Sequence, residues 1–166
     1  DICVSSNFER FLWYMIRKTD GKNDDLKTGK IMSTFMHALS SEKGEFTVSS
    51  ATIEAARELL DSASVTNEET VSTIKETYDN TSNQYILDPQ SAVGINTCLK
   101  YIGASNDSPN THYISLSTAH PAKFSEVVNL ALSDFEGYSF EKDVLPADLK
   151  KLSTLPKKIR LIDTPK

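Results

Sequence analysis

The run Y-I-S-L-S-T-A-H-P-A-K-F at 113–124 constrains the fold more than any other stretch of this chain. Ile114 and Leu116 alternate with serines in an uncharged, β-favouring run, which predicts a short buried strand. Pro121 must end this strand, because proline fixes φ near the helical value and lacks an N–H that a first helical position does not need. A helix is therefore predicted to begin at Pro121, with His120 as its cap.

The turn between this strand and this helix consists of Ser117, Thr118, Ala119 and His120, all of them small or polar. Open α/β sheets bind their ligands at such turns, beyond the carboxyl ends of the strands. The run thus predicts a binding site within an α/β fold that has short strands and many helices. Apolar residues at helical spacing after the turn support the helix: Phe124, Val127, Val128 and Ala131.

Composition allows one core or two small ones, since 166 residues with 39% hydrophobic and 25% charged residues are ordinary for a globular protein. Without an apolar run of roughly 20 residues or a leader-like start, we expect a cytoplasmic protein with no membrane partner. The net charge of −5 argues against nucleic-acid binding. Cys3 and Cys98 form no paired motif, so no metal site is expected.

Several helix starts carry their own capping signals. Ser6 with Glu9, and Thr66 with Glu69, have capping-box spacing. Ser49 or Ser50 can cap a third helix, and Asp88 precedes a proline at a first helical position. The buried face of that last helix is predicted to consist of Ile95, Cys98, Leu99 and Ile102.

The two ends are less regular. Residues 2–4 suggest the end of a strand, and residues 134–166 suggest an irregular tail with a short helix after Leu145-Pro146. Ile159 and Leu161 alternate as in an edge strand. Because neither end has a clear start or stop signal, we expect Asp1 and Lys166 to be cut points within a longer protein.

The run S-T-A-H-P-A-K-F at 117–124 resembles the threonine synthases, pyridoxal-phosphate enzymes of the tryptophan-synthase-β-like fold, or fold type II. Three further runs resemble the same family, its fungal branch above all, in the same order: V-S-S-N-F-E-R at 4–10, I-L-D-P-Q-S-A-V-G at 86–94 and Y-S-F-E-K-D-V-L-P at 138–146. The resemblance implies that residues 1–166 are the C-terminal portion of an enzyme. That enzyme would convert O-phospho-L-homoserine and water to L-threonine and phosphate.

The resemblance also implies roles for single residues. Thr118, with Ser117 beside it, would bind the cofactor by placing a hydroxyl against the pyridine nitrogen; the alternative is a structural hydroxyl that caps the following helix. His120 either caps that helix or lines the cleft, and Ser6 and Asn7 either belong to a helix cap or line the cleft as well.

Two neighbouring residues depart from the family. Gln90 stands where the family usually has histidine, and Ser91 where it has threonine. Glutamine is a candidate to line the cleft, but it cannot titrate, so it cannot serve as an acid or base.

Most of the cofactor machinery is absent from this sequence. The six glycines lie far apart, so no clustered backbone amides can cradle a phosphate. No lysine stands in the family's Schiff-base context, and Lys123 is expected to be a surface charge. We therefore expect no catalytic residue in this chain, an inactive isolated chain, and a partner in the preceding part of the same enzyme. A different fold type II lyase, or a non-catalytic α/β binding domain that stands alone, are the alternatives.

Overall fold

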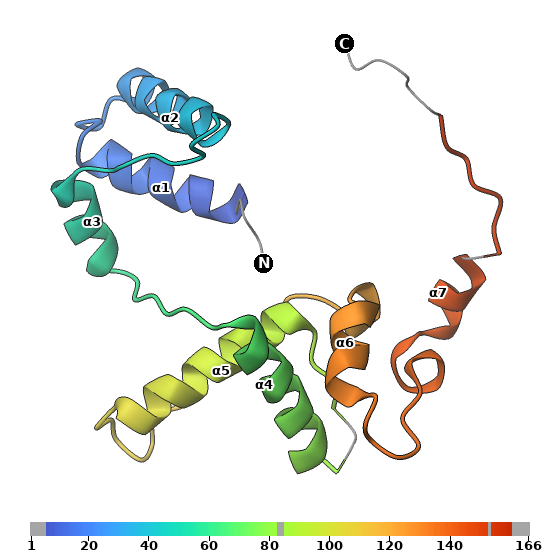
Figure 1. Cartoon of the computed structure of the whole chain (residues 1–166). Helices are drawn as coiled ribbons and strands as arrows, with labels where there is room; N and C mark the ends of the chain where they lie inside the picture. The colour runs from blue at the N-terminus through green and yellow to red at the C-terminus, as the bar shows by residue number, and fades with distance from the viewer. Residues whose placement is uncertain (1–5, 83–84, 153, 161–166) are drawn as a thin grey trace. The chain divides into compact units, whose positions relative to one another are not determined.

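The computed structural model describes residues 6–82, 85–152 and 154–160. These residues form helices joined by loops and turns (Figure 1). In chain order the elements are α1 (Ser6–Lys18), α2 (Asp25–Leu39), α3 (Ser50–Arg57), α4 (Asn67–Asn80), α5 (Pro89–Ala104), the 3-10 turn η1 (Pro121–Lys123), α6 (Ser125–Leu132), the π-helical turn η2 (Phe140–Val144) and α7 (Ala147–Leu152). Across the described residues, no helix is both long and apolar enough to cross a membrane.

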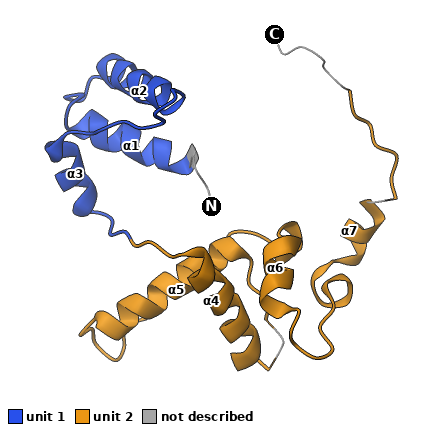
Figure 2. Ribbon diagram, viewed as in Figure 1, with its two compact units in different colours: residues 1–62 blue, residues 63–166 orange. Residues whose placement is uncertain are grey.

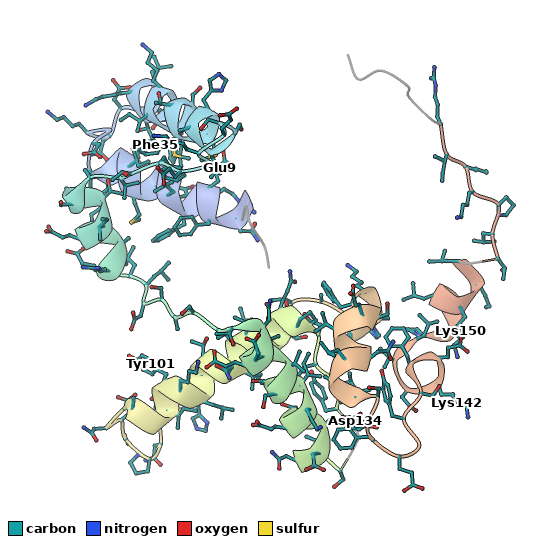
Figure 3. The ribbon with its side chains drawn as sticks, in the orientation of Figure 1. Glu9, Phe35, Tyr101, Asp134, Lys142 and Lys150 are labelled. Carbon is teal, nitrogen blue, oxygen red and sulfur yellow. The ribbon has the colours of Figure 1, made fainter. Side chains whose placement is uncertain are left out.

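The chain divides into two compact units, Asp1–Ser62 and Ala63–Lys166 (Figure 2). In the first unit, Leu12 and Ile16 of α1 are buried against Met32 of α2. Phe35, which Figure 3 shows on α2, stacks on Phe46 with ring centroids 4.7 Å apart. The apolar spacing of each helix thus buries one face in a small core of its own.

Local signals explain the helix starts of this unit. Asp24 caps α2, and its side chain accepts a hydrogen bond from the Lys27 N–H. Of the two serines considered for α3, Ser49 is the cap. Ser6 is the first residue of α1, but its side chain, and with it the predicted capping box, lies outside the described residues. The predicted strand end at residues 2–4 lies outside them too.

The second unit is built around α4, α5 and α6. The predicted capping box at the start of α4 is confirmed, with the Thr66 N–H 2.8 Å from Glu69 Oε2 and the Glu69 N–H 3.2 Å from Thr66 Oγ1. Ile74 of α4 is buried against Val128 and Leu132 of α6. A single apolar cluster therefore holds these helices together.

The start of α5 agrees with the sequence, and its C-terminal half does not. Asp88 caps the helix and Pro89 opens it, as predicted. Ile95 packs on the core, whereas Leu99 is 58% exposed and Ile102 is 44% exposed. The predicted buried face is wrong there because the described helices pack against the first half of α5, while its outer end, marked by Tyr101 in Figure 3, extends past them.

The strand predicted before the turn is wrong. Residues 111–118 have no regular structure, and no strand occurs among the described residues, so this region is helical rather than α/β. Ile114 is 80% exposed and Leu116 is 78% exposed. A strand requires hydrogen bonds to a neighbouring strand, and helix α5 offers none.

The segment nevertheless alternates as a strand would. Tyr113 lies against Tyr101, with ring centroids 6.2 Å apart, and Ser115 lies against Gly94. A Cβ atom on Gly94 would come 2.7 Å from Ser115 Oγ, so the glycine permits a close approach, as its place within a helix suggests. The segment thus runs back along α5 with its polar side inward and its two aliphatic residues outward.

The predicted cap of the helix after the turn is correct, but the α-helix begins later in the chain than Pro121. His120 caps the turn, because its Nδ1 accepts a hydrogen bond from the Ala122 N–H at 3.1 Å. Pro121 begins only a 3-10 turn, since Phe124 has φ −129°, and the α-helix starts at Ser125. Val128 and Ala131, two of the residues with helical spacing, are buried.

In the tail, α7 follows Pro146 and confirms the predicted short helix. Ile159 is 70% exposed and belongs to no strand, whereas Leu161 lies outside the described residues. The predicted edge strand is therefore not present at Ile159. Phe140 and Val144 of η2 pack on the core of the second unit, so the tail is joined to that core as far as η2.

Candidate functional site

The N-terminus of α5 carries a buried carboxylate. The side chain of Asp88 is 1% exposed, and its Oδ1 accepts hydrogen bonds from the N–H groups of Gln90 at 3.0 Å and Ser91 at 3.2 Å. These bonds satisfy amides that have no partner within the helix. A carboxylate suits this position because the helix dipole is positive there.

The second carboxylate oxygen connects the helix to the turn at 117–120. The Ser91 hydroxyl donates to Asp88 Oδ2 and accepts from the Thr118 N–H at 3.0 Å. The Thr118 hydroxyl oxygen lies 3.4 Å from Asp88 Oδ1 and 3.5 Å from Ser91 Oγ. This chain of bonds fixes Thr118, 27 residues after Ser91, at the start of α5.

A pocket of about 370 Å³ opens beside this network. Its wall includes residues 85–88, Ser91, Asp143 of η2, and three residues of the turn, Ser117, Ala119 and His120. Hydroxyl, imidazole and carboxylate groups therefore share one concave surface with aliphatic residues, which is the composition of a small-molecule site.

Residues 91–166 match the family model described as "Threonine synthase, C-terminal". Threonine synthase of Saccharomyces cerevisiae is 51% identical over 165 residues, which are 98% of this chain and 32% of the relative. The chain belongs to the threonine synthase family. Threonine synthase of Schizosaccharomyces pombe is 44% identical over 153 residues, 92% of this chain and 29% of the relative.

Solved threonine synthases confirm the fold of the region. The crystal structure of the yeast enzyme matches with a TM-score of 0.76 and covers 96% of this chain and 31% of its own. A structure of PLP-bound threonine synthase from Brucella melitensis is 29% identical, has a TM-score of 0.61, and covers 93% of this chain and 28% of its own. The chain thus spans about a third of the length of the threonine synthases it matches.

The site residues predicted from the threonine synthase resemblance fall in different places. Ser117 and His120 line the pocket together. Thr118 is exposed, but its hydroxyl turns to the Asp88 network, and it is not among the lining residues. Gln90 is half-buried beside the cap and is not in the lining either. Asn7 is exposed on α1, where its Oδ1 accepts from Arg10, and its place in a cleft stays a prediction.

Sequence reasoning gave Ser91 and Asp143 no role in the site and missed the second role of Asp88. The Asp-Pro pair was a sufficient signal for the cap, and it was interpreted only as a cap. The run I-L-D-P-Q-S-A-V-G, which belongs to the threonine synthase resemblance, contains both Asp88 and Ser91 and could have drawn attention to them. Asp143 lies in the run Y-S-F-E-K-D-V-L-P, which belongs to the same resemblance and could have drawn attention to it as well.

The hydrogen bond to His120 selects one tautomer of its neutral ring. Its Nδ1 accepts a hydrogen bond from the Ala122 N–H, so this nitrogen carries no proton. Nε2 is then the nitrogen that carries the proton of the neutral ring. Capping and lining, the two roles considered for His120, therefore occur together: one nitrogen caps the turn while the ring borders the pocket.

Two tyrosines lie near Asp143 of the pocket wall. Burial raises the pKa of Tyr138 to about 12, with smaller contributions from the charge of Asp143 and from Tyr78. Burial, and then Asp143, also raise the pKa of Tyr78. Both phenols therefore stay neutral near pH 7, and Tyr138 donates a hydrogen bond to Asn129 Oδ1 at 3.0 Å.

Proposed function

We propose that this chain is the C-terminal region of a threonine synthase and forms one wall of its pyridoxal-phosphate site. The complete enzyme would convert O-phospho-L-homoserine and water to L-threonine and phosphate. The observation that carries the proposal is the 51% identity to the yeast threonine synthase over 98% of this chain. A fold type II architecture and a cytoplasmic location belong to the same proposal.

The residues of this chain fit one part of the cofactor. A pyridine nitrogen needs a hydrogen-bonding partner, and Thr118 is an exposed residue that carries a hydroxyl and whose main chain is held by Ser91. A phosphate needs several converging N–H groups, and the separated glycines of this sequence make no such cradle. This chain would therefore hold the ring nitrogen, while the phosphate contacts and the Schiff-base lysine come from the preceding region.

Each group at the site has a limited task. Bound pyridoxal phosphate supplies an electron sink for negative charge that develops on the substrate. Thr118 binds and orients the ring, and the turn that carries Thr118 is fixed by Asp88 and Ser91. Ser117 and His120 present a hydroxyl and an imidazole to the pocket, where they can bind polar groups of a substrate.

An exchange of regions tests the proposal. The matching 165 residues of the yeast threonine synthase are replaced by this chain, and threonine formation from O-phospho-L-homoserine is measured. We expect the chimera to form threonine, with the unchanged yeast enzyme as control. A chimera that folds and takes up pyridoxal phosphate but forms no threonine would contradict the proposal. If the chimera does not fold, the same assay on the full-length protein that carries this chain decides.

The isolated chain gives the complementary result. We incubate it with pyridoxal phosphate, reduce with borohydride and map the modified lysines by mass spectrometry. Weak, scattered modification is expected, because no lysine of this chain stands in a Schiff-base context. Stoichiometric modification of one lysine, for instance the exposed Lys123 of η1, would show that this chain itself carries the Schiff-base lysine.

Fractionation of cells that produce the full-length protein tests the cytoplasmic location. We expect the protein in the cytoplasmic fraction, and its recovery in another fraction would contradict this part of the proposal.

A further inference from the structure

The chain leaves the core of the second unit after Val144. Phe140 and Val144 of η2 pack on that core, and Val144 is buried. Beyond Leu145 every described residue is exposed, namely residues 146–152 and 154–160. We call these residues the exposed segment. It contains α7, which has no buried residue.

The exposed segment nevertheless has local structure. The N–H groups of Leu149 and Lys150 donate to the Pro146 carbonyl oxygen at 3.0 and 3.1 Å, and the Thr154 N–H donates to the Lys151 carbonyl oxygen at 3.1 Å. A helix of 6 residues gains little from these bonds alone, because isolated helices shorter than about 12 to 15 residues are marginal in water. Helix α7 therefore needs a partner surface that the described residues do not provide.

Four apolar side chains of the exposed segment are open to solvent. Leu149 is 37% exposed, Leu152 58%, Leu155 55% and Ile159 70%. Leu149 and Leu152 are three residues apart, so they lie on one side of α7. Single exposed leucines are common on protein surfaces, but a series of them in a segment without a core of its own indicates a face that is covered in the complete protein.

The exposed segment is also basic, although the chain as a whole is acidic. It carries one carboxylate, that of Asp148, and a group of cationic side chains: Lys150, Lys151, Lys157, Lys158 and Arg160. Lys151 pairs with Asp148 at 3.4 Å, whereas the last three cations form no ion pair with a described residue. Ile159 lies between two of them, so a surface that fits this segment is apolar and bordered by carboxylates.

We propose that the exposed segment is a docking segment that binds the preceding region of the same enzyme, in an apolar groove bordered by carboxylates. This chain spans about a third of the length of the threonine synthases it matches, so the rest of the enzyme can supply that groove. The proposal rests on the part of the proposed function that makes this chain the C-terminal region of a longer enzyme.

Docking of the exposed segment would also affect the pocket, through η2. Asp143 of η2 lies in the pocket wall, and its Oδ2 accepts the Ser139 N–H at 2.7 Å. Val144 joins η2 to the core, and Leu145 then leads into the exposed segment. With that segment bound, η2 is held between the core of this chain and the preceding region, and the pocket wall keeps its shape.

Limited trypsin digestion of the full-length enzyme tests the docking, with the peptides identified by mass spectrometry. Trypsin cleaves after Lys157, Lys158 and Arg160 only when these bonds are accessible, so we expect slow cleavage there in the native wild type. Leu152→Asp and Leu155→Asp each place a charge on the apolar face. Each should accelerate cleavage by about tenfold or more, because the burial of one leucine shifts such an equilibrium by at least that factor.

Thr154→Asp is the matched control. It adds the same charge to the exposed segment, at a residue whose hydroxyl donates to the Lys151 carbonyl oxygen within the segment at 2.8 Å. We expect its cleavage rate to stay close to that of the wild type. Equal acceleration by Thr154→Asp and by the leucine variants would show that added charge alone releases the segment, and would overturn the apolar docking.

Hydrogen exchange with mass spectrometry tests the effect on the pocket wall. The Asp143 N–H donates to the Ser139 carbonyl oxygen at 2.8 Å. In the full-length Leu152→Asp variant we expect residues 139–144 to exchange faster than in the wild type. Unchanged exchange there, in a variant whose exposed segment is released, overturns the effect on η2.

The wild-type digestion separates the remaining outcomes. Rapid cleavage in the exposed segment overturns the proposal, because the segment is then open to solvent in the complete enzyme. Protection that rises with protein concentration overturns it as well, because the partner is then a second copy. If the leucine variants do not fold, the wild type still decides. An enzyme that protects the segment but forms no threonine overturns the proposed activity and leaves this inference standing.

Discussion

Helices α2 and α5 begin with the same device and use it differently. Both have an aspartate cap whose side chain accepts hydrogen bonds from the first turn. Asp24 is exposed and accepts the Lys27 N–H at 3.0 Å. Asp88 is 1% exposed, accepts two N–H groups, and uses its other oxygen to hold Ser91, which in turn holds Thr118.

The comparison shows that burial changes what a cap does. An exposed cap stabilises one helix and exchanges its bonds readily with water. A buried carboxylate must have partners for both oxygens, since an unpaired charge inside a protein is costly. At α5 these partners come from two segments, so the cap joins a helix to the turn that carries the candidate site.

The largest expected effect is that of Asp88→Ala. The variant loses the cap and leaves the Ser91 hydroxyl without its acceptor, so we expect the free energy of unfolding to fall by about 2 to 4 kcal/mol. Urea titration of the chain, followed by far-UV circular dichroism, measures this. A loss no larger than that of an exposed cap would show that the buried network adds nothing.

Ser91→Ala should have the next largest effect. Asp88 Oδ2 and the Thr118 N–H both lose a partner, and we expect a loss of about 1 to 3 kcal/mol. Hydrogen exchange at the Thr118 amide should accelerate as well. Ser72→Ala is the matched control, because Ser72 is exposed on α4 and bonds only within its helix to Glu76. Equal losses for the two serines would argue against the connecting role of Ser91.

Asp24→Ala should cost less. Its cap bond is exposed, and removal of such a cap is worth about 0.5 to 1 kcal/mol. The measurement is the same urea titration, and Asp24→Asn should be close to neutral. If Asp24→Ala costs as much as Asp88→Ala, the two helix starts are equivalent and the contrast between them fails.

High pH should lower the stability of the second unit more than that of the first. This is the smallest effect of the series. The pKa of Tyr138 is raised to about 12, from about 10 in an unfolded chain. Because the folded pKa is the higher one, its stabilising contribution is present below pH 10 and is lost as the pH rises toward 12. Hydrogen exchange with mass spectrometry should therefore show the second unit opening before the first in this range, and Tyr138→Phe should reduce the difference.

Structural features that depend only on residues close together in the chain could be predicted from the sequence. The caps at Thr66, Asp88 and His120 were correct because a cap is fixed within one turn of the chain. Ile114 and Leu116 alternate with serines as predicted, but the prediction that they are buried was wrong. Alternation shows the period of a segment and does not show which of its two sides is covered. The bonds from Asp88 and Ser91 to Thr118 join residues 27 or more apart, and no local pattern encodes them.

Thr118→Val in the full-length enzyme tests the central claim most directly. Valine keeps the shape of threonine and removes the hydroxyl, so one neutral hydrogen bond to the ring is lost. The account predicts that the dissociation constant for pyridoxal phosphate, from titration of its visible absorption, rises by about 2- to 13-fold, which corresponds to roughly 0.5 to 1.5 kcal/mol. The absorption maximum should shift, with little change in unfolding. Unchanged affinity and absorption together with a clear loss of stability would contradict it, and Thr118 would then be a structural residue that ties the turn to α5.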